Sequence, residues 1–208
     1  LLGPNGESEL LLLFGLRDLA RGDFESAGVV AQRLSKAKTL ELPHHLRWEI
    51  SLSKRDRASA EACECDPVSQ LLPWLTHRLL GVRTLSLRGD WNPVCDRFRE
   101  LLRSEPASPR IFRELALCGL EYGQDPLARE CFAKISNQFP ENVYAQLGTQ
   151  LLNWSGASTK TKRWLADLKK HEPMVNRLAG NWQNRFQDCG RLDLASRLEE
   201  MFSSDNTE

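Results

Sequence analysis

The histidines and cysteines are the side chains of this sequence most suited to binding a metal or acting as a nucleophile, and their spacing favours neither role. His44 and His45 are adjacent, so on a helix their side chains diverge instead of forming the one-face pair that a metal needs. Cys63 and Cys65 form the one close cysteine pair, with a one-residue gap in place of the two residues of zinc knuckles and redox motifs. We therefore expect no catalytic residues, no metal and no cofactor.

Short motifs also give no indication of catalysis or of cofactor binding. The sequence contains no phosphate-cradling glycine pattern, no nucleophile elbow and no paired-carboxylate spacing. The densest basic patch, GASTKTKR at 156–163, could hold a phosphate at a helix N-terminus, but a capped and solvated helix start is the favoured interpretation. The two RGD triplets, at 21–23 and 88–90, are interpreted as turns of a repeat and not as adhesion signals.

The composition is that of an ordinary globular chain. Its 208 residues are 41% hydrophobic, and 28 basic residues balance 28 acidic ones. A chain with no net charge lacks the strong positive field of a general nucleic-acid binder, so nucleic acid is not the expected partner. The longest apolar run, Leu10 to Leu16, is far shorter than a membrane span. Scattered cysteines without pair spacing indicate a reducing compartment, so we expect a cytoplasmic protein.

Glycines recur at a fixed step along the chain. Gly89, Gly123, Gly156 and Gly190 follow one another at intervals of 34, 33 and 34 residues, and Gly22 lies two steps before Gly89. Such a period is typical of two-helix repeats. A further turn is expected near residue 56, where Asp56 stands in place of glycine.

Prolines give a second measure of the same period. Pro73, Pro106, Pro140 and Pro173 recur at a step of 33 or 34 residues. Glycine reverses the chain after a first helix, because it adopts a positive φ without steric cost, and proline ends the second helix. Apolar residues between these turns keep a 3.6-residue rhythm, and no stretch alternates as a strand. The sequence therefore predicts an all-α chain of helical hairpins.

The repeat resembles that of the tetratricopeptide-repeat family. Besides the turn glycines and the closing prolines, the matching residues are an aromatic two places after the glycine, a small residue five places after it and an aromatic nine places after it: Phe24 and Trp91; Ala27, Ala128 and Ala195; Phe98 and Phe132. The resemblance implies a right-handed α-solenoid of about six antiparallel hairpins. It implies one domain over 1–208, with units 8–41, 42–74, 75–108, 109–141, 142–175 and 176–202 and a disordered tail at 203–208.

Some units depart from the family pattern. The second unit lacks the glycine, and Pro67 interrupts its second helix, so we expect that unit to be distorted. The fifth unit has Thr161 where three other units have alanine, and the last has no closing proline. Terminal repeats are often irregular, and related helical-hairpin repeats remain an alternative.

The resemblance also implies a binding surface. Proteins of this family hold an extended peptide or a helix of a partner on a concave face formed by the first helix of each pair. Arginine and amide side chains suit that task because they hydrogen-bond a peptide backbone or a carboxylate, which favours an acidic partner. The residues of these types at inward positions, together with one tryptophan, are Arg47, Arg83, Arg110, Arg113, Gln146, Gln150, Asn153, Trp154, Arg177, Asn181 and Asn184.

The predicted function is therefore a non-catalytic scaffold or adaptor that binds another protein or peptide. One alternative is the repeat portion of a larger enzyme, such as a glycosyl- or sulfo-transferase. A second alternative is an RNA-binding helical repeat, against which the balanced charge counts. The sequence identifies neither the partner nor the oligomeric state.

Overall fold

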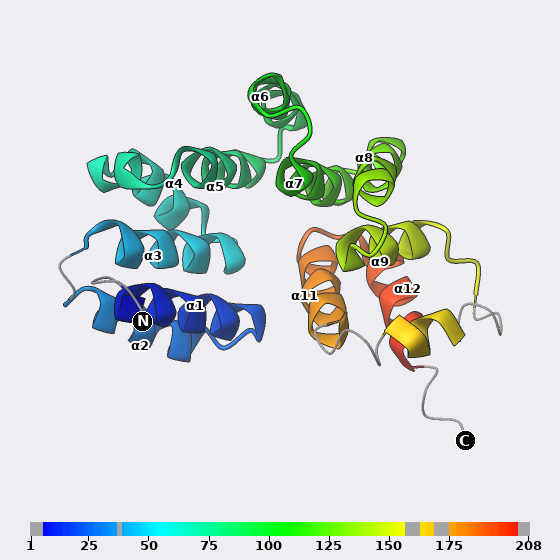
Figure 1. Cartoon of the computed structure of the whole chain (residues 1–208), viewed down its shortest axis with the longest axis horizontal. Helices are drawn as coiled ribbons and strands as arrows, with labels where there is room; N and C mark the ends of the chain where they lie inside the picture. The colour runs from blue at the N-terminus through cyan, green and yellow to red at the C-terminus, as the bar shows by residue number, and fades with distance from the viewer. Residues whose placement is uncertain (1–5, 37–38, 157–162, 169–174, 204–208) are drawn as a thin grey trace. The chain divides into compact units, whose positions relative to one another are not determined.

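The computed structural model of the chain describes residues 6–36, 39–156, 163–168 and 175–203. Within these ranges the chain is helical and contains no strand, which confirms the all-α prediction. The chain forms two compact units, Leu1–Ser104 and Glu105–Glu208, each of which is described by itself (Figure 1). Among the described helices, none is both long and apolar enough to cross a membrane.

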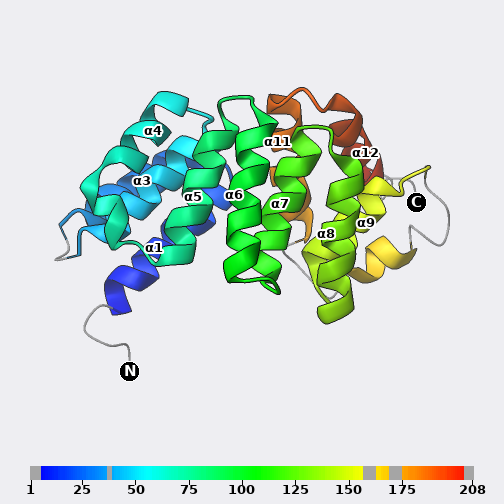
Figure 2. The same ribbon diagram turned by 90° about the horizontal axis from the view of Figure 1, so that it is seen from above.

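The first unit is a stack of three helical hairpins. Its elements, in chain order, are α1 (Gly6–Ala20), α2 (Phe24–Leu34), α3 (Glu41–Ser53), α4 (Arg57–Cys65), the short 3₁₀ helix η1 (Pro67–Leu71), α5 (Trp74–Ser86) and α6 (Trp91–Ser104). Helix α3 lies between the first hairpin and α5, and α4 packs on α5 (Figures 1 and 2). This arrangement leaves α5 with α3 and α4 on one side and α6 on the other.

The second unit contains further hairpins of the same kind. Its elements are α7 (Pro109–Glu121), α8 (Asp125–Gln138), α9 (Val143–Leu152), a helical stretch at 163–168, α11 (Val175–Asp188) and α12 (Leu192–Ser203). Helices α7 and α8 pack together, as do α11 and α12, and α9 contacts both α8 and α12. Pro173 and residues 204–208 of the predicted tail lie outside the described residues, whereas Ser203, the first residue of that tail, is the last residue of α12.

The predicted glycine turns are confirmed. The five glycines that set the period all have positive φ: Gly22, Gly89, Gly123, Gly156 and Gly190. At the end of α1 the amide of Asp23 donates to the carbonyl of Asp18, and that of Gly22 donates to Leu19. The same pair of bonds closes α7 and α11, and it is the hydrogen-bond pattern of the Schellman motif. The hairpins therefore reverse through one repeated backbone structure.

The turn of the second hairpin lies one residue earlier than the sequence predicted. The positive φ, 54°, belongs to Arg55, and the amide of Asp56 donates to the carbonyl of Ser51 in the same closing pattern. Asp56 instead caps the next helix, because its carboxylate accepts from the amide of Ser59, as that of Asp23 accepts from Ser26. The prediction that Asp56 replaces the glycine was wrong, and Arg55 holds that position.

The predicted interruption of the second hairpin is confirmed. Helix α4 ends at Cys65 after nine residues, whereas α6 and α8 each run for 14. Asp66 adopts an extended conformation, and its carboxylate caps η1 by accepting from the amide of Val68. Because Pro67 cannot continue the α-helix, η1 leaves the path of α4. Helix α5 is therefore covered over a shorter length than a 14-residue α4 would cover.

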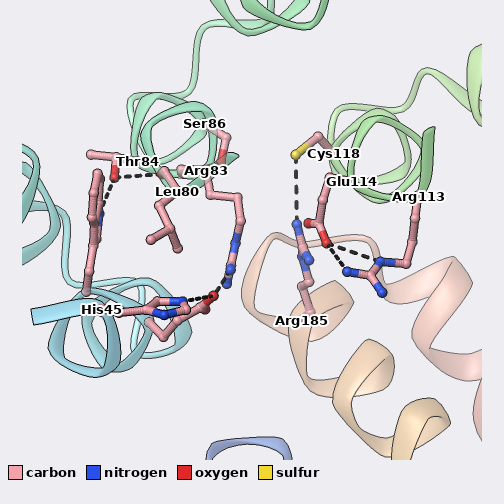
Figure 3. Close-up of polar contacts among 11 residues, drawn as sticks. His45, Leu80, Arg83, Thr84, Ser86, Arg113, Glu114, Cys118 and Arg185 are labelled. Atoms are coloured by element: carbon pink, nitrogen blue, oxygen red, sulfur yellow. Dashed lines mark hydrogen bonds and ion pairs between the residues drawn. The ribbon is translucent and has the colours of Figure 1, made fainter. Parts of the chain in front are cut away.

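Polar contacts join α3 to α5 in the first unit. The indole of Trp48, which is fully buried, donates to the hydroxyl of Thr84 at 2.8 Å, and that hydroxyl donates to the carbonyl of Leu80 (Figure 3). Arg83 forms an ion pair of 2.6 Å with Glu49. Burial raises the pKa of the Glu49 carboxyl. Arg83, together with His45 one turn before Glu49 on α3, outweighs this effect and holds the pKa at about 2. These contacts fix α5 against the preceding hairpin.

In the second unit, the last hairpin contacts a hairpin two repeats earlier. Arg185 of α11 forms an ion pair with Glu121 of α7, and its guanidinium reaches the sulfur of Cys118 (Figure 3). Arg191, in the turn before α12, pairs with Asp125 at 3.1 Å. Stacked repeats ordinarily contact only their neighbours, so this unit departs from simple stacking.

The position of the second turn generates a stability prediction. A left-handed backbone conformation costs a residue with a side chain about 1 kcal/mol, which glycine avoids. We expect Arg55→Gly to be more stable than Arg55→Ala by about that amount in urea unfolding, since both variants remove the same side chain. Asp56→Ala should lower the free energy of unfolding because it removes a helix cap. Equal stabilities for the two Arg55 variants would contradict this structure of the turn.

Candidate functional site: a cleft beside the shortened fourth helix

A cleft of about 570 Å³ opens in the first unit where α4 ends early. Its walls come from the end of α4, one face of α5 and the facing side of α6. The lining residues are Glu64, Cys65, Trp74, His77, Arg78, Gly81, Val82, Leu85, Arg88, Arg97, Glu100, Leu101 and Ser104. The cleft thus combines charged side chains with an apolar wall.

Glu64 occupies a position that other hairpins fill with a buried apolar side chain. It is nine residues after the positive-φ residue of its turn, and Ala31, Phe98 and Phe132 hold the same position in the first, third and fourth hairpins. Those three side chains are buried, with 5%, 1% and 0% of their surface exposed. Glu199, the equivalent residue of α12, is exposed on the last described helix. Glu64 therefore places a carboxylate where the repeat usually packs hydrocarbon.

The surroundings of Glu64 match those of Phe132. The ring of Phe132 packs so closely on Gly148 of α9 that a Cβ at that glycine would collide with it. Glu64 faces Gly81 of α5 in the same way, and a Cβ at Gly81 would lie 3.1 Å from its Oε1 atom. Each glycine thus lets the second helix of the preceding hairpin approach the first helix of the next. A carboxylate is smaller than a phenyl ring, which contributes to the open volume.

Some of the charged side chains that line the cleft form ion pairs, and others do not. Arg88 binds Glu61 at 3.0 Å, and Arg97 binds Glu100 at 2.9 Å. Within the described part of the chain, neither Arg78 nor the carboxylate of Glu64 makes a hydrogen bond or an ion pair. Burial raises the pKa of the Glu64 carboxyl, although Arg88 and Arg97 oppose that shift. The guanidinium of Arg78 and the carboxylate of Glu64 are therefore available to bind a ligand.

The apolar part of the cleft is also accessible. Trp74, at the start of α5, has 47% of its surface exposed. Val82, Leu85 and Leu101 also line the cleft, and Val82 and Leu101 are buried. An aromatic ring and aliphatic side chains next to unpaired charges suit the binding of an amphipathic ligand.

The two predicted contact residues of the first unit lie outside this cleft. Arg47, on α3, is exposed and donates to the hydroxyl of Ser35. Arg83, on α5, is committed to the ion pair with Glu49, with 21% of its side chain exposed. Their role in contacting a partner stays a prediction.

The other predicted contact residues belong to the second unit, where several make internal contacts. Arg113 binds its neighbour Glu114 at 3.0 Å, and its guanidinium lies over the ring of Tyr144 (Figure 3). Gln146 donates to the carbonyl of Pro140, and Asn153 accepts from Arg129. The structure places Arg110 and Asn184 on exposed positions of α7 and α11, and it places Gln150 on α9 and Asn181 on α11 at half-buried positions.

Trp154 and Arg177 complete the predicted set. Trp154 is half-buried, and its indole donates to Glu200 of α12 at 2.9 Å. This bond ties the end of α9 to the last hairpin. Arg177 belongs to α11, but its side chain lies outside the described part of the structure. The structure brings Trp154 close to α12.

Sequence reasoning missed Glu64, Arg78 and Trp74 as site residues. The missed signal is the aspartate that follows each of the first three turns: Asp23, Asp56 and Asp90. Alignment on these aspartates places Arg55 at the glycine position and Glu64 at the position of Phe98 and Phe132. An acidic residue in an otherwise apolar repeat position would then have been visible. The opening of the cleft over α5 depends on tertiary packing and was not visible.

Comparisons with known proteins give no relative for the chain: it matches no protein-family model, no curated protein and no solved structure.

The raised pKa of Glu64 generates a pH prediction. The folded protein binds the Glu64 proton more tightly than the unfolded chain, in which the ordinary pKa is 4.5. As pH rises from 4.5 through the raised value, Glu64 therefore removes stability from the wild type. Glu64→Gln has no such proton, so its stability relative to wild type should increase between about pH 4 and about pH 7 in urea unfolding. A difference that stays constant or reverses over this range would contradict the prediction.

Proposed function

We propose that the protein is a non-catalytic scaffold that binds a segment of another protein in the cleft beside α4. The observation that carries the proposal is Glu64, which leaves an accessible cleft where other hairpins place a buried side chain. Unpaired Arg78 and exposed Trp74 give that cleft the two kinds of group that dominate protein interfaces.

The fold that we propose is an α-solenoid similar to the tetratricopeptide-repeat family. Its support is the step of 33 or 34 residues between turns, each with a positive φ at the same position, from Gly22 through Arg55 to Gly190. Hairpins of this kind give a scaffold helices in a fixed order, on which interaction surfaces can be built.

Binding in this proposal depends on a cleft that is ordered before the partner arrives. The bond between Trp48 and Thr84 and the ion pair between Glu49 and Arg83 hold α5 against α3. The wall of the cleft that α5 provides is therefore fixed by contacts on its opposite side. A preformed wall reduces the entropy that is lost on association, so the partner segment bears most of the cost of ordering.

Site-specific photo-crosslinking tests the proposed function. A benzoylphenylalanine in place of Ser104, an exposed lining residue of α6, should form a covalent adduct with a partner protein in cells. The adduct should be lost when Glu64→Phe fills the cleft. Benzoylphenylalanine in place of Arg99 is the matched control, because that residue is exposed on α6 but does not line the cleft.

Two results would contradict the proposal. One is equal crosslinking from the Ser104 and Arg99 positions, which would indicate collisions instead of a site. The other is an adduct at Ser104 that survives Glu64→Phe in a variant with unchanged circular dichroism and a thermal unfolding midpoint no lower than that of wild type. The partner identified by the adduct would then bind elsewhere on α6.

A further inference from the structure

One wall of the cleft is a stripe of residues on a single helix. Trp74, Arg78, Gly81 and Leu85 follow one another at steps of four, three and four residues, so they form one stripe along α5. Helix α4 covers this stripe only as far as Cys65, five residues short of the 14 found in α6. Five residues of α-helix correspond to about 7.5 Å. The uncovered part of the stripe therefore lies where a longer α4 would have packed.

Arg78 and the residue that Glu64 faces lie about one helical turn apart on α5. Arg78 is three residues before Gly81, against which the carboxylate of Glu64 lies, and three residues span about 4.5 Å along a helix axis. Arg88 and Arg97 already form ion pairs with Glu61 and Glu100. A ligand that matches the cleft must therefore bring an acidic group to Arg78 and a basic group to Glu64.

We infer that the segment bound in the cleft is a short amphipathic helix of a partner protein, which carries an acidic and a basic residue three or four positions apart. This inference rests on the proposed function. Residues at that spacing lie on one face of a helix, which matches the three-residue step on α5 between Arg78 and Gly81, the residue that Glu64 faces. An apolar residue on the same face packs against Trp74. The helix occupies the place of the missing turns of α4, in the manner of a helix bound in a groove.

A helix fits this cleft better than the other common ligands. Addition of a strand needs an exposed sheet edge, and the described residues contain no strand. A nucleic-acid backbone would bring its phosphates against the carboxylates of Glu64 and Glu100, and the basic groups beside them, Arg88 and Arg97, are already paired. A helix with both charges satisfies Glu64 and Arg78 together and leaves those ion pairs intact.

A displayed library of helix-forming peptides, selected on the intact protein, tests this inference. Peptides of about 14 residues are long enough to present four turns, and one face is randomised. Binders should be enriched in an acidic and a basic residue three or four positions apart, beside an apolar residue. Arg78→Glu should weaken the selected peptide at least about tenfold, and a peptide with lysine in place of its acidic residue should regain that affinity. Arg99→Glu, the matched control on α6, should leave binding within about twofold.

The outcomes separate the ligand class from the proposed function. Selected peptides that are blocked by Glu64→Phe but bind Arg78→Glu as tightly as wild type would overturn the charge-pair inference and leave the cleft as a binding site. Peptides that bind the Glu64→Phe variant unchanged would overturn both. A single-stranded uridine oligonucleotide that binds the wild type and loses its affinity in Arg78→Glu would show that the cleft accepts nucleic acid, which also overturns the inference.

Discussion

The candidate site depends on one kind of contact between successive hairpins. In this contact, the second helix of one hairpin packs closely on a glycine in the first helix of the next hairpin. Phe132 on Gly148 shows this contact in its apolar form, with a fully buried ring. Glu64 on Gly81 uses the same geometry with a carboxylate, and the early end of α4 leaves the neighbouring surface of α5 uncovered. A carboxylate in place of a ring, together with a shorter helix, thus leaves an accessible cleft where the fourth hairpin has a packing contact. Helices of the repeat form the walls of the cleft, and the short α4 leaves its space open.

The local structure of the hairpins could be predicted from sequence because it is set by neighbouring residues. Glycine takes positive φ at Gly22 and Gly123 without steric cost, and Pro67 ends α4 because it cannot continue a helix. The turn at Arg55 was misplaced by one residue because a residue other than glycine adopts the left-handed conformation there. That single shift concealed the equivalence of Glu64 with the buried phenylalanines.

The contacts between distant segments could not be predicted, because they depend on how hairpins pack in three dimensions. Arg83 was predicted as a partner contact from its type and helical position, and the sequence gives no sign that Glu49 lies 2.6 Å away. Arg185 and Glu121 form an ion pair although 64 residues and a whole hairpin separate them in the sequence. A regular stack, in which each repeat contacts only its neighbours, does not predict this contact. The same limit applies to the cleft, whose volume depends on three helices at once.

Glu64 occupies the position of a buried ring, and the cleft is the space that such a ring would partly fill. The decisive measurement is the free energy of unfolding of Glu64→Phe against wild type at neutral pH. We expect an increase of about 1 to 2 kcal/mol, because the variant buries a phenyl ring on Gly81 and removes a half-buried carboxylate without a hydrogen-bond partner among the described residues. A decrease in the free energy of unfolding would contradict it, because the position would then not accept the side chain that the repeat places there.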